Sequence, residues 1–177
     1  SLNHSVEASG EIVIVEDSGA QFDNSILIGH RDFASAAVQN ALSNFVGFQI
    51  DEPRGDGFRF RARLILADGT QLSGTSISGL ARNQSYTWHY IYNPNFAHGR
   101  LTVEVFSADR RVGQSVIEMG TGARATSGVF NAFGVGSGGI GSPSASNLVR
   151  LFIDNVSYSI LSANPFPLVP ILDLLLD

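Results

Sequence analysis

The acidic side chains are the first candidates for chemistry, because glycoside hydrolysis needs two carboxyl groups facing each other across a substrate. In retaining enzymes these groups lie about 5 Å apart. Glu104 and Glu118 are single acids on separate predicted strands, and Asp109 lies beyond the end of its strand. The sequence therefore predicts no catalytic pair and favours a protein that is not an enzyme.

Signatures of other reactions are missing from the sequence as well. The chain has no cysteine, and all 11 basic residues are arginine, so thiolate, zinc-finger and Schiff-base lysine chemistry are excluded. No GxSxG, HExxH or P-loop motif occurs, and the histidines show no metal-ligand spacing. Gly134, Gly136 and Gly139, with Asp154 downstream, imitate a dinucleotide fingerprint. A predicted strand follows in place of the helix that would hold a pyrophosphate, so this match is rejected.

A row of aromatic side chains is a candidate for binding. Tyr86, Trp88, Tyr90 and Tyr92 alternate along one predicted strand and therefore share a face. Such a face suits either a hydrophobic core or a platform on which sugar rings stack. The core is the favoured interpretation. Trp88 and Tyr92 are the candidates for carbohydrate contact, and Tyr92, nearest a loop, is expected to be the most exposed.

Arg59, Arg61 and Arg63 alternate in the same way and form a stripe on the polar face of their strand. A guanidinium group pairs with a carboxylate or sulfate through parallel hydrogen bonds. The stripe is therefore a candidate for binding an acidic glycan or a neighbouring subunit. The alternative is an ordinary solvated sheet face, because isolated surface charges contribute little.

Length and composition limit the class of protein. A chain of 177 residues, 44% of them hydrophobic, is long enough for one core and short for two domains. Its formal net charge of -5 argues against nucleic acid as a partner, because such binding needs a basic surface. No apolar run reaches the about 20 residues of a transmembrane helix. The first residues do not resemble a signal peptide, so any leader is expected to have been removed already.

Short apolar or alternating stretches must position these candidates. Residues 58–66 alternate most regularly, and Asp68 with Gly69 predicts a hairpin turn into a partner strand over residues 71–77. Further strands are predicted over residues 11–15, 25–29, 45–50, 86–92, 101–106, 115–119, 129–135 and 148–160. The pattern allows at most one short helix, over residues 33–42. It predicts an all-β, antiparallel sandwich or barrel.

Three segments resemble one known family. SNFVGFQIDEPRGDGFRFRARLILADGT is similar to the front of its modules, YTWHYIYNPNFAHGRLTVEVF to a central block, and FNAFGVGSG with LFIDNVSYS to the closing strands. The family is the concanavalin A-like lectin/glucanase superfamily, in particular the LamG-like jelly-roll modules of bacterial secreted and surface proteins. The resemblance implies a concanavalin A-like jelly roll that is secreted or on the cell surface. It also implies carbohydrate binding, adhesion or a structural role, with glycoside hydrolysis in a minority.

The resemblance further implies a candidate metal site, because jelly-roll modules often hold a structural calcium ion between an N-terminal acid and the closing strand. The residues in question are Glu11, Glu16, Asp17 and Asp154. The alternative is that they are surface acids and that Asp154 forms a turn. No other cofactor is expected.

An apolar segment follows the last predicted strand and divides the chain into a sandwich domain, residues 1–161, and an arm, residues 162–177. Three prolines keep the arm extended, while residues 171–176 suit a strand. An apolar surface of this size is expected to be buried by packing. The arm can pack on its own sandwich or on the sheet edge of a neighbouring copy, and the neighbouring copy is favoured. The arm residues are Pro167, Leu168, Val169, Ile171, Leu172, Leu174, Leu175 and Leu176.

The sequence thus predicts a non-catalytic extracellular structural module that self-assembles, as a homo-oligomer or polymer, into a filament or surface layer through its arm. A monomeric carbohydrate-binding module with a glycan as partner is the alternative. A glycoside hydrolase is the third and least favoured reading.

Overall fold

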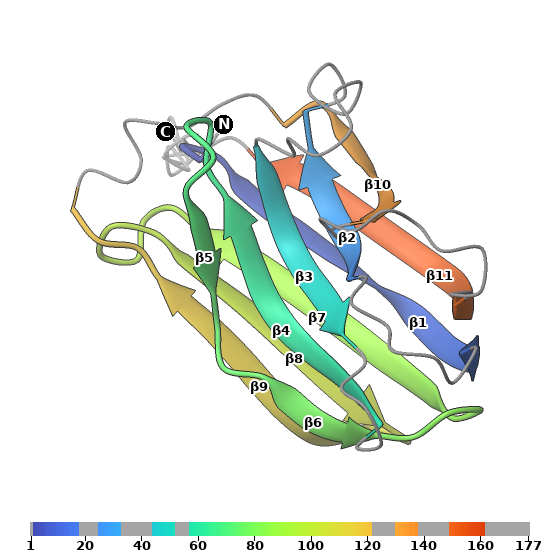
Figure 1. The fold of residues 1–177 in the computed structure, drawn as a ribbon. Helices are drawn as coiled ribbons and strands as arrows, with labels where there is room; N and C mark the ends of the chain where they lie inside the picture. The colour runs from blue at the N-terminus through green and yellow to red at the C-terminus, as the bar shows by residue number, and fades with distance from the viewer. Residues whose placement is uncertain are drawn as a thin grey trace, which may run out of the picture.

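The protein is a β-sandwich of two antiparallel sheets (Figure 1). The structure, a computed structural model, describes residues 2–17, 25–32, 44–51, 57–121, 130–137 and 149–161. These ranges contain eleven strands and no helix, which confirms the predicted all-β, antiparallel sandwich. The short helix expected over residues 33–42 and the arm lie outside the described residues.

The first sheet contains five strands in the order β11-β1-β7-β8-β9. The strands span Ser5–Asp17 (β1), Ser85–Asn93 (β7), Arg100–Ser107 (β8), Arg110–Glu118 (β9) and Val149–Leu161 (β11). β1 pairs with β7 on one side and with β11 on the other. Among the described strands, β11 and β9 are therefore the two edges of this sheet.

The second sheet follows the order β10-β2-β3-β4-β5, with β6 also paired to β4. Its strands span Ile26–Arg31 (β2), Phe45–Asp51 (β3), Phe58–Ile65 (β4), Gln71–Ser73 (β5), Ile77–Leu80 (β6) and Ala132–Ser137 (β10). β10 is an edge strand on the same side of the sandwich as β11, as Figure 1 shows. The two sheet edges that the last strands form thus lie near each other.

The predicted hairpin turn is confirmed. The amide of Leu66 donates to the Thr70 carbonyl (2.9 Å), and Gly69 has the positive φ of 82° that such a turn requires. The predicted partner strand, residues 71–77, is divided into β5 and the start of β6. Where the two separate, the amide of Ala62 donates to Oγ of Ser115 on β9, at 2.8 Å. This hydrogen bond ties the two sheets together.

The core forms from the alternate residues of facing strands. Trp88 lies at its centre, with its ring 4.9 Å from that of Phe48 and stacked on that of Tyr90. The sheets touch each other mainly where β3 to β6 of one lie over β7 to β9 of the other. On the opposite side the rings of Phe133 (β10) and Tyr158 (β11) stack at 4.9 Å across the gap.

Candidate functional site

The outer face of the second sheet carries the predicted arginine stripe. Arg59, Arg61 and Arg63 are half-buried, whereas the residues between them on β4 are fully buried in the core. Arg61 pairs with Asp51 of β3, with Nη2 2.9 Å from Oδ2. The other oxygen of Asp51 accepts hydrogen bonds from Ser25 (2.7 Å) and Gln49 (2.6 Å). Asp51 is therefore fully occupied by neighbours on this face.

Arg63 is held by neutral partners. Its guanidinium donates to the side chains of Ser73 and Gln71 on β5. Burial and the nearby charge of Arg61 lower the pKa of Arg63, while Asp51 acts in the opposite direction. Because a guanidinium stays protonated in proteins, Arg63 keeps its positive charge, while the two side chains that accept its hydrogen bonds, Ser73 and Gln71, are neutral.

Three glycines continue the same face toward its edge. Gly134 of β10, Gly29 of β2 and Gly47 of β3 are direct neighbours across the strands, and Gly47 is paired in turn with Arg63. The backbones of β2 and β3 approach each other closely at these glycines. A Cβ atom on Gly29 or Gly47 would overlap the backbone of the other strand. The Phe45 ring lies over both glycines. Gly29 and Gly47 are themselves buried, as are Leu27 and Phe45 beside them, so this part of the outer face is closed to solvent.

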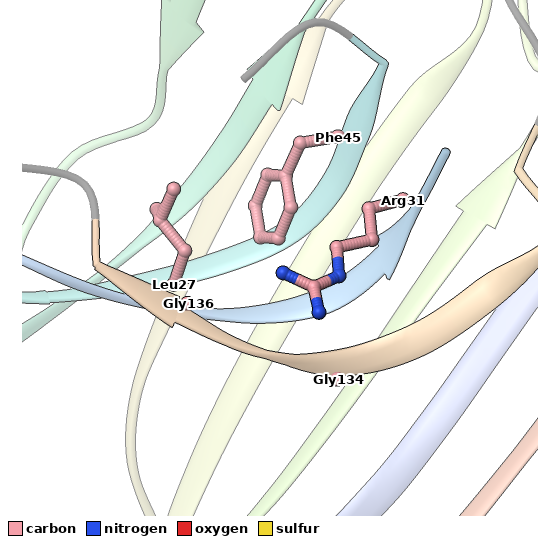
Figure 2. A pocket seen from close by; sticks show the side chains of 5 residues that line it. All are labelled: Leu27, Arg31, Phe45, Gly134 and Gly136. Atoms are coloured by element: carbon pink, nitrogen blue, oxygen red, sulfur yellow. The ribbon is translucent and has the colours of Figure 1, made fainter. Parts of the chain in front are cut away.

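A small pocket opens beside these glycines (Figure 2). Leu27, Arg31, Phe45, Gly134 and Gly136 line it. The guanidinium of Arg31 reaches from β2 over β10, and Cβ atoms built on Gly134 and Gly136 would lie 3.4 and 3.3 Å from its terminal nitrogens. Its Nε atom is buried, and the guanidinium makes no hydrogen bond or ion pair within the described part of the chain. The pocket is too small to hold a water molecule, so Arg31 packs against buried apolar side chains here and does not line an open binding site.

The aromatic candidates lie elsewhere. Trp88 and Tyr92 are both 0% exposed, and the Tyr92 hydroxyl donates to the Leu2 carbonyl at 3.0 Å. The expectation that Tyr92 is exposed is therefore wrong, because Leu2, before β1, and Met119, after β9, close over the end of β7. The row forms core, as favoured, and these two rings are not available to stack on a sugar.

The candidate calcium ligands are only partly described. Glu11 and Asp154 are partners across β1 and β11. Oε1 of Glu11 accepts from the Asn155 amide group at 3.1 Å, and Oδ1 of Asp154 accepts from the Asn155 backbone at 2.7 Å. Glu16 and Asp17 belong to β1, but their side chains lie outside the described residues. Within the described ranges, three or more metal-ligating side chains do not gather anywhere.

His30 is a buried polar group that sequence reasoning missed. His30 is 1% exposed, with Nδ1 2.7 Å from the Tyr90 hydroxyl and edge-on contacts to the rings of Phe133 and Tyr158. Burial lowers the pKa of His30 from 6.5 to about 4. The available signal was its inward position on β2, two residues after the buried Ile28.

The open side of the sandwich exposes apolar side chains. Val135 of β10 follows Phe133 at the same inward-facing parity, and Val156 and Ile160 flank Tyr158 on β11 in the same way. These four residues, named here the open edge, are 46% (Val135), 40% (Val156), 60% (Tyr158) and 44% (Ile160) exposed. Inward-facing apolar residues are normally covered by packing, whereas these four leave 40% or more of their surface exposed.

Neither a protein-family model nor a curated protein sequence matches this chain. The resemblance to concanavalin A-like modules therefore stays a prediction. In the described ranges there is no helix of the length and apolar character needed to cross a membrane.

Proposed function

We propose that the protein is a non-catalytic extracellular structural module that polymerises through residues 162–177. The observation that carries this proposal is the open edge. It combines exposed apolar side chains with two edge strands, β10 and β11, each of which has one side without a neighbouring strand among the described residues. An unpaired strand edge with apolar side chains is a template for a strand from another chain.

The arm has the chemistry to fill this template. Residues 171–176 are apolar apart from Asp173 and contain no proline, so they can pair as a strand. Val135, Val156, Tyr158 and Ile160 would cover their apolar side. Backbone hydrogen bonds would supply affinity, and the alternate side chains would supply register.

The positions of the prolines favour a neighbouring copy as the acceptor. For the arm to pair with its own β11, the chain would have to reverse soon after Leu161, where Pro165 and Pro167 remove donors from the start of such a hairpin. The proline-free stretch begins only after residues 162–170. Nine extended residues reach about 30 Å, far enough to leave the parent sandwich. Head-to-tail insertion of this kind need not close and produces polymers.

The test compares the full chain with a version truncated after Ala163, by light scattering and negative-stain microscopy over a range of concentrations. We expect polymers from the full chain and a folded monomer from the truncated one. Ile160→Arg places a charge in the open edge and should also give monomers. Val112→Arg is the matched control, since Val112 is 43% exposed on β9, the other edge strand of the same sheet.

A full chain that stays a folded monomer at all concentrations would refute the proposal. So would polymers that persist in the truncated chain. If Val112→Arg dissolves the polymers and Ile160→Arg does not, the acceptor is the β9 edge and the role of the open edge is wrong.

A further inference from the structure

We propose that β10 is the strand that receives the arm, and that Asp173 of the arm pairs with Arg31 of the accepting copy. The inference rests on the proposed assembly through residues 162–177 and names its acceptor strand and its charged contact. Asp173 is the one charged residue among residues 162–176. Its partner would be a cation that lies over the edge strand of the second sheet.

Arg31 belongs to β2, but its guanidinium lies over the neighbouring strand β10 (Figure 2). Cβ atoms built on Gly134 and Gly136 would lie 3.4 and 3.3 Å from its terminal nitrogens, so side chains at these positions would crowd it. Both glycines are half-buried, whereas Leu27 and Phe45 further inside the sheet are buried. The charge therefore lies at the rim of the outer face, and an arm beside β10 would meet it without entering the closed pocket.

The arm can present one acid to this charge. Side chains of an extended strand over residues 171–176 alternate between two faces. Three leucines share one face, and Asp173 lies on the other. The leucine face suits the apolar inner side of the open edge, so Asp173 would point to the outer side, where Arg31 lies. Adjacent strands are about 4.8 Å apart, so an aspartate opposite either glycine of β10 comes within reach of the guanidinium.

The regularity of β10 makes it a better acceptor than β11. All six residues of β10 pair with β2 without a register shift, and the proline-free stretch of the arm can match this length. The pairing of β11 with β1 shifts between Ser157 and Asp154, where Asn155 has a positive φ of 52°. A bulge of this kind twists an edge strand and hinders the addition of a further strand.

Charge favours the same strand. The described side chains at the outward positions of β11 include Phe152, Asp154, Ser157 and Ser159, none of which is basic. Asp154 would repel an acid of the arm. A charge at the edge of a sheet normally hinders pairing with a foreign strand. Arg31 would therefore disfavour strands without an acid at the matching position and would select the arm.

The test measures the critical concentration for polymerisation of the full chain by light scattering. Asp173→Arg would bring two cations together, and we expect it to raise the critical concentration at least about tenfold. Asp177→Arg is the matched control, because Asp177 is the other acid of the arm and follows residues 171–176. The double variant Arg31→Asp with Asp173→Arg restores opposite charges, so its critical concentration should return to within about threefold of the wild-type value.

Disulfide formation between copies locates the acceptor strand. The chain has no cysteine, so two introduced cysteines report a single contact. If Asp173 lies opposite a glycine of β10, Val135 lies opposite Leu172 or Leu174, whichever direction the arm runs. Val135→Cys combined with Leu172→Cys or with Leu174→Cys should therefore give covalent polymers on oxidation. Ile160→Cys with the same arm positions tests β11 and should give none.

Three results would overturn this inference and leave the assembly proposal intact. One is an equal critical concentration for Asp173→Arg and Asp177→Arg, a comparison in which both changes lie in the arm and leave the sandwich unaltered. Another is a folded double variant that polymerises no better than Asp173→Arg. The third is cross-linking through Ile160→Cys and not through Val135→Cys, which would make β11 the acceptor. A full chain that never polymerises would instead refute the assembly proposal, and this inference with it.

Discussion

Protonation of one buried side chain should make the sandwich unstable in mild acid. His30 is enclosed between the sheets, with Tyr90 at hydrogen-bond distance and the Phe133 ring 5.4 Å away. A charge there would lie among aromatic rings. Burial therefore lowers the pKa of His30 from 6.5 to about 4 in the folded protein, whereas the unfolded chain keeps the ordinary value.

The shift fixes both the sign and the size of the effect. Between pH 6.5 and about 4 the unfolded state binds a proton that the folded state does not, so the free energy of unfolding rises with pH in this window. The contribution is complete above pH 6.5 and is lost as the pH falls toward 4. Each pKa unit corresponds to about 1.4 kcal/mol, so the loss is about 3 kcal/mol. That is a large part of the stability of an ordinary domain.

The assay is urea unfolding of the chain truncated after Ala163, followed by tryptophan fluorescence from Trp88, at pH values from 7.5 to 4. His30→Phe keeps an aromatic ring but cannot titrate, and its unfolding free energy should vary much less over this window. His89→Gln is the matched control for the loss of a histidine, because His89 is partly exposed on the surface beside Glu7 (3.2 Å). A wild-type profile that is flat between pH 6.5 and 4 would refute the reasoning. So would a His30→Phe profile as steep as the wild-type profile.

Two further changes test the packing. Gly47→Ala should destabilise by about 3 kcal/mol in urea unfolding, because its Cβ would overlap the backbone of β2; Gly120→Ala, where nothing lies within 4 Å, is the control, and equal stability of the two would contradict the geometry. Ser115→Ala should cost about 1–3 kcal/mol, because it leaves the buried amide of Ala62 without its acceptor. Ser107→Ala removes a half-buried hydroxyl that accepts only from the solvent-exposed Gln84 side chain and should cost less than about 1 kcal/mol, so similar losses in both would refute a special role for Ser115.

The sequence was a good guide wherever alternation alone determines structure. Residues 58–66 alternate, and β4 has its arginines on one face and its core residues on the other. The division of residues 71–77 into two strands was not predictable, because it depends on Ser115, which lies far away in the sequence and bonds Ala62 across the sandwich.

The candidate sites were predicted less well, for a related reason. Alternation places Trp88 and Tyr92 on one face but does not say which face another sheet covers, and the structure buries both. Arg31 was not singled out, because its setting arises from Gly134 and Gly136, about a hundred positions further along the chain. Only pairing of β10 with β2 brings them together.

β10 belongs both to the core and to the proposed acceptor edge. Its residues alternate between the faces of the sheet, so Phe133 and Val135 belong to the inner side while Gly134 and Gly136 lie beside Arg31 on the outer side. An arm that pairs along β10 would need this alternation and would therefore bind only the folded sandwich. Polymerisation and folding would then be thermodynamically linked, because each bound arm raises the free energy of unfolding of the copy that accepts it.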